Sequence, residues 1–225
     1  MKLKPLYWIL VKLPFAFVLF SFIVVILFKF IPVRYTPLML KRSIQYRNND
    51  KYQTIKQKWV SIEDISPELL HAVILAEDQR FYEHHGFDVK EIKTVWRNYK
   101  NGNGKLRGCS TISQQTAKNV FTLGSHTWIR KALESWWTVL IELIWGKQRI
   151  LEVYMNVIEL DMGVFGVGAA ARINYNSDPQ SISVSDVASL VSRIPCPLAD
   201  RNSPSAIRAE MRKRSIIKAL CKQSR

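Results

Sequence analysis

Two adjacent acids, Glu77 and Asp78, stand at the end of an apolar stretch and precede two histidines and Gly86. A carboxylate that apolar neighbours shield from water has a raised pKa, so it accepts a proton near neutral pH more readily than a surface glutamate does. Glu77 is therefore our candidate for a general base. The structural alternative is an ion pair between Glu77 and Arg80 at the edge of a helix.

A polar run from Arg107 to Asn119 could bind an anion. We expect its second half to be a helix, and a helix that opens near Gly108 and Ser110 presents free backbone amides to a negative charge. Lys118 would add a positive charge further along the same helix. The alternative is an ordinary solvated helix, because a run so rich in Ser, Thr and Gln is too polar to build a core.

A third group consists of Arg130, Lys131 and Glu134. Their spacing of three and four residues places the side chains on neighbouring rows of one helix. The three side chains would therefore lie together in the first turns of the helix. Taken alone, such a group is an ordinary surface salt bridge, which contributes little to stability.

A helix must position Glu77, and the sequence predicts that this helix begins at Ser66 and Pro67. The serine can cap the first free amides, and proline fits the first helical position without the loss of a hydrogen bond. Steps of three and four residues then place the carboxylate on the apolar face, in the row Leu70, Ile74, Glu77 and Phe81.

Further helices are expected over residues 89–99, 128–145, 147–156, 185–194 and 205–220, where apolar residues recur at helical spacing. Gly163, Gly166 and Gly168 predict a tight turn. No segment alternates as a strand does, and no internal repeat is present, so we expect the fold to be mainly α.

The N-terminal region is typical of a membrane anchor. Residues 13–28 carry no charge, and the segment from Tyr7 to Ile31 is long enough to cross a bilayer. Residues 29–32 offer no small-x-small cleavage site, which favours an uncleaved anchor over a signal peptide; a buried core helix is the other alternative. Lysines and arginines flank the span on both sides, so they do not settle its orientation.

The chain therefore divides into three parts: an N-terminal tip with the transmembrane anchor at residues 1–31, a connector at 32–64, and a folded domain at 65–225. Pro32 and Pro37 interrupt any helix that would continue straight out of the membrane. We expect the connector to lie on the lipid headgroups.

The charge balance narrows the choice of partners. Among 225 residues, 33 are Lys or Arg and 18 are Asp or Glu, and the net charge of +15 predicts a polyanionic partner: nucleic acid, an anionic membrane or a phosphorylated substrate. The anchor favours the membrane. Cys109, Cys196 and Cys221 form neither a disulfide pattern nor a metal motif, and the adjacent His84 and His85 lack the spacing of zinc ligands.

Taken in order, these segments resemble the peptidoglycan glycosyltransferases of glycosyltransferase family 51, in particular the short, membrane-anchored, monofunctional biosynthetic transglycosylases. Five blocks carry the resemblance. The first three are ED-x-x-F-x-x-H-x-G from Glu77 to Gly86, G-x-STI-x-QQ-x-x-KN from Gly108 to Asn119, and RK-x-x-E from Arg130 to Glu134. The fourth is K-x-x-ILE-x-YLN from Lys147 to Asn156, with Met155 in place of leucine, and the fifth is the GVFGV that precedes AAA.

The resemblance implies a lysozyme-like, mostly helical domain with a small membrane-proximal subdomain, placed on the periplasmic side of a bacterial inner membrane, that polymerises the cell-wall precursor lipid II. It implies that Glu77 takes the proton from the 4-hydroxyl of the acceptor sugar, which attacks the anomeric carbon of the growing chain and expels its lipid pyrophosphate. Glu134 would lie in the donor half of the cleft and orient the diphosphate together with Lys118, Arg130 and Lys131.

The resemblance also implies that Ser110 and Gln115 bind sugar or phosphate oxygens. It extends substrate binding to the remaining motif residues, which are Asp78, Phe81, His84, Gly108, Thr111, Gln114 and Asn119. No cofactor or metal site is required, and a divalent cation is compatible with the reaction. The expected partners are lipid II, the growing glycan strand, the membrane and proteins of cell-wall synthesis or division, but not nucleic acid.

Several positions depart from the family pattern. His126 stands where relatives usually carry an arginine that helps to hold the diphosphate, and a neutral histidine would weaken that clamp at pH 7. Gly168 replaces a common glutamate, Cys109 replaces glycine or alanine, and residues 173–176 and 193–197 also differ from the pattern. These departures could reduce activity in the C-terminal half of the cleft.

Three alternatives to an active polymerase stay open. A weakened paralogue would bind the lipid substrate or the cell wall without turnover. A lysozyme-like cleaving enzyme would also use a lone glutamate, but it would need no cationic cluster because its leaving group is a sugar hydroxyl. A basic membrane-tethered binding module would leave both glutamates dispensable.

Overall fold

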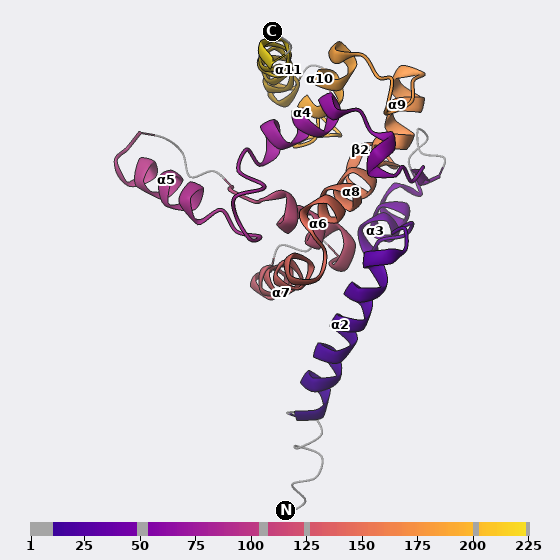
Figure 1. Ribbon diagram of the computed structural model, residues 1–225, viewed down its shortest axis with the longest axis vertical. Helices are drawn as coiled ribbons and strands as arrows, with labels where there is room; N and C mark the ends of the chain where they lie inside the picture. The colour runs from indigo at the N-terminus through magenta and orange to yellow at the C-terminus, as the bar shows by residue number, and fades with distance from the viewer. Residues whose placement is uncertain (1–10, 49–53, 104–107, 124–126, 200–202, 224–225) are drawn as a thin grey trace, which may run out of the picture.

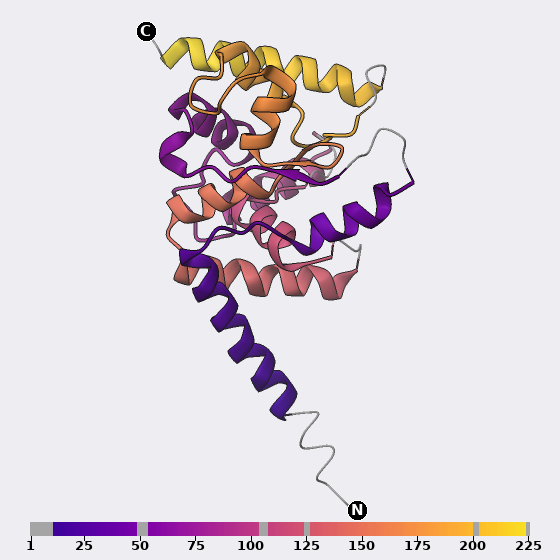
Figure 2. The same ribbon diagram turned by 90° about the vertical axis from the view of Figure 1, so that its right-hand side faces the viewer.

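The computed structural model describes residues 11–48, 54–103, 108–123, 127–199 and 203–223. The predicted mainly α fold is confirmed, and one small three-stranded sheet is added to the helices. Figure 1 shows α2 (Leu13–Phe30) leaving the folded body at one end. Figure 2 shows α11 (Pro204–Gln223) lying across the opposite end, so the anchor and the C-terminal helix are far apart.

The α2 helix is the expected apolar helix. It has 18 residues, and it is long and apolar enough to cross a membrane. Only Ser21 and Val25 are buried, whereas a core helix would be buried along a whole face, so the core-helix alternative is wrong. The helix ends at Phe30, before Pro32, as predicted. The beginning of the predicted span, at Tyr7, lies outside the described residues.

Side chains of two other helices, α7 (Trp128–Ile144) and α8 (Lys147–Val157), form hydrogen bonds with α2. The indole nitrogen of Trp136 donates to Ser21 Oγ at 3.2 Å. The Arg149 guanidinium donates to the carbonyl oxygens of Phe28 at 2.8 Å and Ile31 at 2.6 Å. Because the last carbonyls of a helix have no partner within it, Arg149 satisfies groups that would otherwise need water.

The segment predicted as a connector contributes to the body. It contains α3 (Pro37–Tyr46), the strand β1 (Lys56–Gln57) and the short helix η2 (Ile62–Asp64). In the sheet, β1 pairs in parallel with β3 (Val164–Phe165), and β3 pairs in antiparallel with β2 (Glu159–Asp161). The sequence predicted none of these strands, because two or three residues are too few for an alternating pattern to appear.

Three helices form the centre of the body: α6 (Ile112–Phe121) packs against both α7 and α8. In α8 the apolar residues at helical spacing, Ile150, Leu151, Tyr154 and Met155, are all buried. In α7, Trp137 and Leu140 are buried, but Leu133 and Ile144 are only partly so.

The expectation that the polar run 107–119 cannot build a core was wrong. Most side chains of α6 are buried, including Ser113, Thr116 and Ala117. The polar ones are satisfied inside the protein: Ser113 donates to the Glu142 carboxylate, and Thr116 donates to the carbonyl of Ile112 at 2.8 Å. A buried hydroxyl costs little when it keeps a hydrogen bond, so composition alone misjudged this helix.

The remaining helices are α5 (Val89–Lys100) and α10 (Val184–Ser192), close to their predicted ranges, and α9 (Val167–Tyr175), which was not predicted from the sequence. In Figure 1, α5 projects to the side of the body, while α10 and α11 lie together. The glycine turn is confirmed at Gly163 and Gly166, whose φ angles are +69° and +74°. Gly168 lies inside α9 instead, where a Cβ atom would meet the Lys58 carbonyl oxygen at 2.3 Å.

Candidate active site

Glu77 is the last residue of α4 (Pro67–Glu77). This helix begins as predicted, with the Ser66 side chain accepting a hydrogen bond from the backbone amide of Leu69 at 3.2 Å. The predicted row of apolar residues is wrong at its end. The helix stops at Glu77 because Asp78 adopts an extended backbone, with φ −161°, so Phe81 does not lie on the same helix face.

The Glu77 carboxylate faces two other helices. The Gln115 side-chain amide of α6 donates to Glu77 Oε2 at 3.0 Å, and the charges of Lys118 in α6 and Arg212 in α11 act on it. Burial raises the pKa of Glu77, and these neighbours oppose part of that rise. The predicted direction of the shift is confirmed. The alternative pair with Arg80 is wrong, since Arg80 is paired with Asp88.

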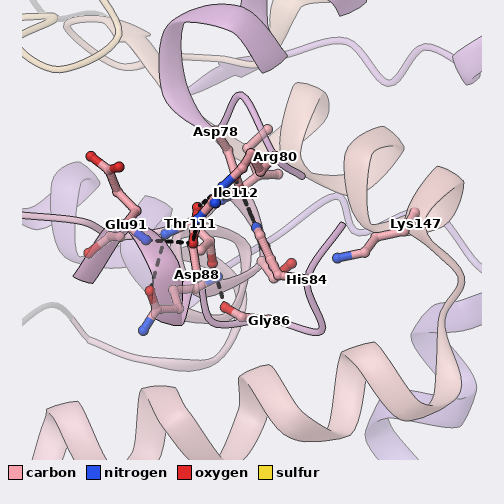
Figure 3. Close-up of polar contacts among 12 residues, drawn as sticks. Asp78, Arg80, His84, Gly86, Asp88, Glu91, Thr111, Ile112 and Lys147 are labelled. Carbon is pink, nitrogen blue, oxygen red and sulfur yellow. Dashed lines mark hydrogen bonds and ion pairs between the residues drawn. The ribbon is translucent and has the colours of Figure 1, made fainter. Parts of the chain in front are cut away.

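Asp78 ties the Glu77 segment to the start of α6. Its carboxylate accepts a hydrogen bond from the Ile112 amide at 3.0 Å and lies 2.9 Å from His84 Nε2. Figure 3 shows Asp78 and His84 pointing toward each other beside Thr111 and Ile112. The expectation of free amides for a ligand anion at the start of this helix is therefore corrected, because the anion there is the protein's own Asp78 carboxylate.

A capping box of Thr111 and Gln114 binds two further amides at the start of α6. The Gln114 amide donates to Thr111 Oγ1 at 3.2 Å, and the Thr111 amide donates to Gln114 Oε1 at 3.1 Å. The Thr111 hydroxyl also donates to the carbonyl of Gly86 at 2.6 Å (Figure 3). Gly86 has φ +87°, and a Cβ atom there would lie 2.8 Å from the Thr138 methyl group, so this position requires glycine.

Several motif residues therefore point into the protein. Asp78, Phe81, Thr111, Gln114 and Asn119 are all buried. Of these, Asp78, Thr111 and Gln114 form the hydrogen bonds described above, which join the segment after Glu77 to the start of α6.

The cationic group is assembled around Glu134, whose side chain is 4% exposed. Arg130 donates to one carboxylate oxygen of Glu134, and Lys131 Nζ lies 3.3 Å from the other. The surface-salt-bridge alternative is wrong because the carboxylate is buried. Burial lowers the pKa of Lys118, and the charge of Glu134 opposes this shift. The charges of both glutamates, Glu134 and Glu77, act on Lys118.

A cavity of about 380 Å³ opens beside Glu77. Gly108 and Ser110 line it and are exposed, and Cys109 between them is partly exposed. A second cavity of about 1580 Å³ lies elsewhere, between α3, Trp59 and Leu123. The smaller cavity is the candidate site, because Glu77, with its raised pKa, lines it.

Two neighbours of Glu77 were not among the predicted site residues. Arg212 belongs to the C-terminal helix, which the sequence identified only as basic and amphipathic, and no local pattern relates it to Glu77. Tyr154 stands within the fourth family block, but its type suggested a core residue. Its hydroxyl donates to Gln115 Oε1 at 3.2 Å.

The departures from the family pattern fall in different places. His126 lies outside the described residues. Gly168 packs against the backbone of Lys58 and the side chain of Val60, at the contact between α9 and β1. Among the described residues no three His, Cys, Asp or Glu side chains gather as a metal site would need.

Replacing Asp78 by alanine should lower the free energy of unfolding by about 2–4 kcal/mol, because two buried polar groups, the Ile112 amide and the His84 ring, lose their partner. Urea unfolding in detergent measures the change. Asp178→Ala is the matched control, since Asp178 forms only exposed ion pairs with Lys58 and Arg172. Equal stability losses for the two variants would contradict the role assigned to Asp78.

Known proteins are similar in sequence to this chain over most of its length. The transglycosylase family profile matches residues 44–220. A biosynthetic peptidoglycan transglycosylase of Bacteroides thetaiotaomicron is 43% identical over 83% of this chain and 75% of its own length. The proteins of the same name from Haemophilus influenzae strain PittEE and Caulobacter vibrioides are 41% and 44% identical, over 89% and 78% of this chain and 83% and 74% of their own lengths. Together with the arrangement of Glu77, Lys118 and Glu134, these matches show that the chain belongs to the transglycosylase family.

Proposed function

We propose that this protein is a peptidoglycan glycosyltransferase that polymerises lipid II into glycan strands. One observation carries the proposal: a buried carboxylate interacts with a cationic group. The charge of Lys118 acts on Glu77. The charges of Arg130, Lys131 and Glu134 in turn act on Lys118. The names of the relatives support the same reaction.

In the proposed reaction, the 4-hydroxyl oxygen of an acceptor lipid II attacks C1 of the growing chain. The new C1–O bond forms as the bond from C1 to the diphosphate oxygen breaks, and the hydroxyl proton passes to the Glu77 carboxylate. The leaving lipid diphosphate takes the bonding electron pair. Lys118, Arg130 and Lys131 stabilise the charge that it gains.

The cationic group favours transfer over glycan cleavage. A cleaving enzyme expels a sugar hydroxyl, which takes up a proton and needs no cation. Here three cations, Lys118, Arg130 and Lys131, interact with two carboxylates, Glu134 and Glu77, so the group has positive charge left over for a diphosphate. We propose that no cofactor is required, and that a divalent cation would act only by adding to this charge.

We further propose that α2 crosses the bacterial inner membrane once and that the folded body lies on its periplasmic side. The hydrogen bonds from Trp136 and Arg149 to α2 support a body held close to the membrane surface. Enzyme and lipid-linked substrate would then share one leaflet, which raises their effective concentration. Beyond lipid II, the glycan strand and the membrane, proteins of wall synthesis or division are the proposed partners.

The test is incubation of the detergent-purified full chain with fluorescent lipid II, followed by separation of the products by size. A ladder of glycan strands is expected. Bound lipid II without any ladder would overturn the polymerase and favour a binding module. Shortening of preformed glycan strands would favour the lysozyme-like cleaving enzyme instead.

A further inference from the structure

One buried hydroxyl stands behind the carboxylate that the proposed function uses. Tyr154 of α8 is fully buried, and its hydroxyl donates to Gln115 Oε1 at 3.2 Å. The amide nitrogen of the same Gln115 donates to Glu77 Oε2 at 3.0 Å. Tyr154, Gln115 and Glu77 come from three helices, α8, α6 and α4, and two consecutive hydrogen bonds connect them.

The surroundings determine which way the Gln115 amide points. Its nitrogen has two acceptors nearby, Glu77 Oε2 and, at 3.5 Å, the carbonyl oxygen of Ser110. Its oxygen has one donor, the Tyr154 hydroxyl. If the amide were turned over, its oxygen would face two other oxygens. The observed orientation is the one that gives each polar atom a partner of the opposite kind.

Tyr154 is suited to hold this orientation because its hydroxyl stays protonated. Burial, together with the negative charges of Glu77 and Asp78, raises the pKa of the Tyr154 hydroxyl well above its usual value. The hydroxyl therefore keeps its proton to higher pH than an exposed tyrosine does, and it can donate to the side-chain oxygen of Gln115. With that donor on its oxygen, the Gln115 amide presents its nitrogen to Glu77.

We propose that Tyr154 is a positioning residue: its hydroxyl fixes the Gln115 amide so that the amide nitrogen is held on the Glu77 carboxylate. The inference rests on the proposed function, in which Glu77 is the general base. It also changes the expected role of Gln115, whose amide nitrogen is engaged by Glu77 and is not free for a sugar or phosphate oxygen.

The consequence concerns the pH at which Glu77 is ionised. Burial raises its pKa, while Gln115, Arg212 and Lys118 lower it and the charge of Asp78 raises it. Gln115 acts on the ionised form because it donates to a carboxylate oxygen. Without that hydrogen bond the pKa of Glu77 rises, and its carboxyl group stays protonated up to a higher pH. A protonated Glu77 cannot act as the general base, so activity is lost over part of the pH range in which the wild type works.

Tyr154→Phe removes only the hydroxyl, and the pH profile of kcat/KM on lipid II tests its role. We expect the acid limb to move to higher pH. The value of kcat/KM on that limb should fall by about two- to tenfold, as the loss of one hydrogen bond between neutral groups would give, with a much smaller change at alkaline pH. A profile parallel to the wild type would mean that the hydroxyl contributes only to packing, and it would overturn the proposal.

Two further variants separate positioning from general damage. Tyr46→Phe is the matched control, because the buried Tyr46 hydroxyl donates to Glu159 at 2.8 Å, away from the site; it should leave the acid limb in place. Gln115→Met should move the limb in the same direction as Tyr154→Phe. If Tyr154 acts through Gln115, the double variant should match Gln115→Met alone, whereas additive shifts would contradict that route.

A measurement on the wild type keeps the inference testable even if Tyr154→Phe does not fold. The side-chain amide resonance of Gln115, assigned by its loss in Gln115→Met, should shift with pH over the range in which Glu77 titrates. An amide resonance that does not change with pH would overturn the inference. If the resonance shifts but the wild type makes no glycan, the proposed function is wrong, while the hydrogen bonds from Tyr154 to Gln115 and from Gln115 to Glu77 are supported.

Discussion

Replacing Glu77 by glutamine should reduce glycan polymerisation by about 10²–10⁴-fold, the range that a general base typically supplies. Glutamine has almost the same shape but cannot take a proton from the acceptor hydroxyl. Because Lys118, Arg130 and Lys131 are unchanged, binding of lipid II should remain largely intact. The measurement is the initial rate of strand formation from fluorescent lipid II, with binding followed separately on the same preparation.

The matched control is Glu83→Gln, which changes the same residue type on an exposed position of the following loop. It should polymerise at the wild-type rate. Turnover retained by Glu77→Gln would remove Glu77 from the role of base, and Asp78 could not replace it, since its carboxylate is already engaged by the Ile112 amide and His84.

Replacing Lys118 by alanine should weaken the apparent affinity for the donor by about 10–100-fold, because one charge-assisted contact to the diphosphate is lost. The maximal rate should change less than the affinity. Varying the lipid II concentration in the polymerisation assay separates the two. Lys93→Ala, on the exposed face of α5, is the control and should change neither.

The same lysine should make donor binding weaker at alkaline pH. Burial lowers the pKa of Lys118, so its charge is present at low pH and is lost, as pH rises, earlier than that of a surface lysine. Donor affinity in the wild type should therefore fall on the alkaline side. Lys118→Arg keeps its charge at every working pH and should abolish this fall; an identical alkaline profile in both proteins would argue against a diphosphate contact at this position.

The sequence predicted the local features of the site well. Ser66 and Pro67 specify the start of α4 through interactions within one helical turn, so their spacing is sufficient evidence. The grouping of Arg130, Lys131 and Glu134 also follows from spacing along one helix. The family resemblance, which the matched profile and the relatives confirm, added the expectation that separate blocks meet in one cleft.

The errors arose where a partner lies far away in the chain. The polar helix α6 was expected to be solvated, but its hydroxyls are buried against partners such as Glu142, which belongs to another helix. The amides at its start were expected to be free, but Asp78 occupies one of them across 34 residues. Composition cannot show whether a polar group finds a partner, and that decides whether it can be buried.

The sequence by itself therefore determined the apolar N-terminal helix, the mainly α architecture and the start of the α4 helix, and it selected Glu77 and Glu134 as candidates. Each of these depends on spacing within a few residues or on residue type. Only the tertiary structure decided that Gln115 donates to Glu77, that Tyr154 orients Gln115, and that Arg212 of the C-terminal helix acts on the same carboxylate. The physical reason is that a hydrogen bond or a charge interaction depends on distance in space, which helix packing sets and which no local pattern encodes.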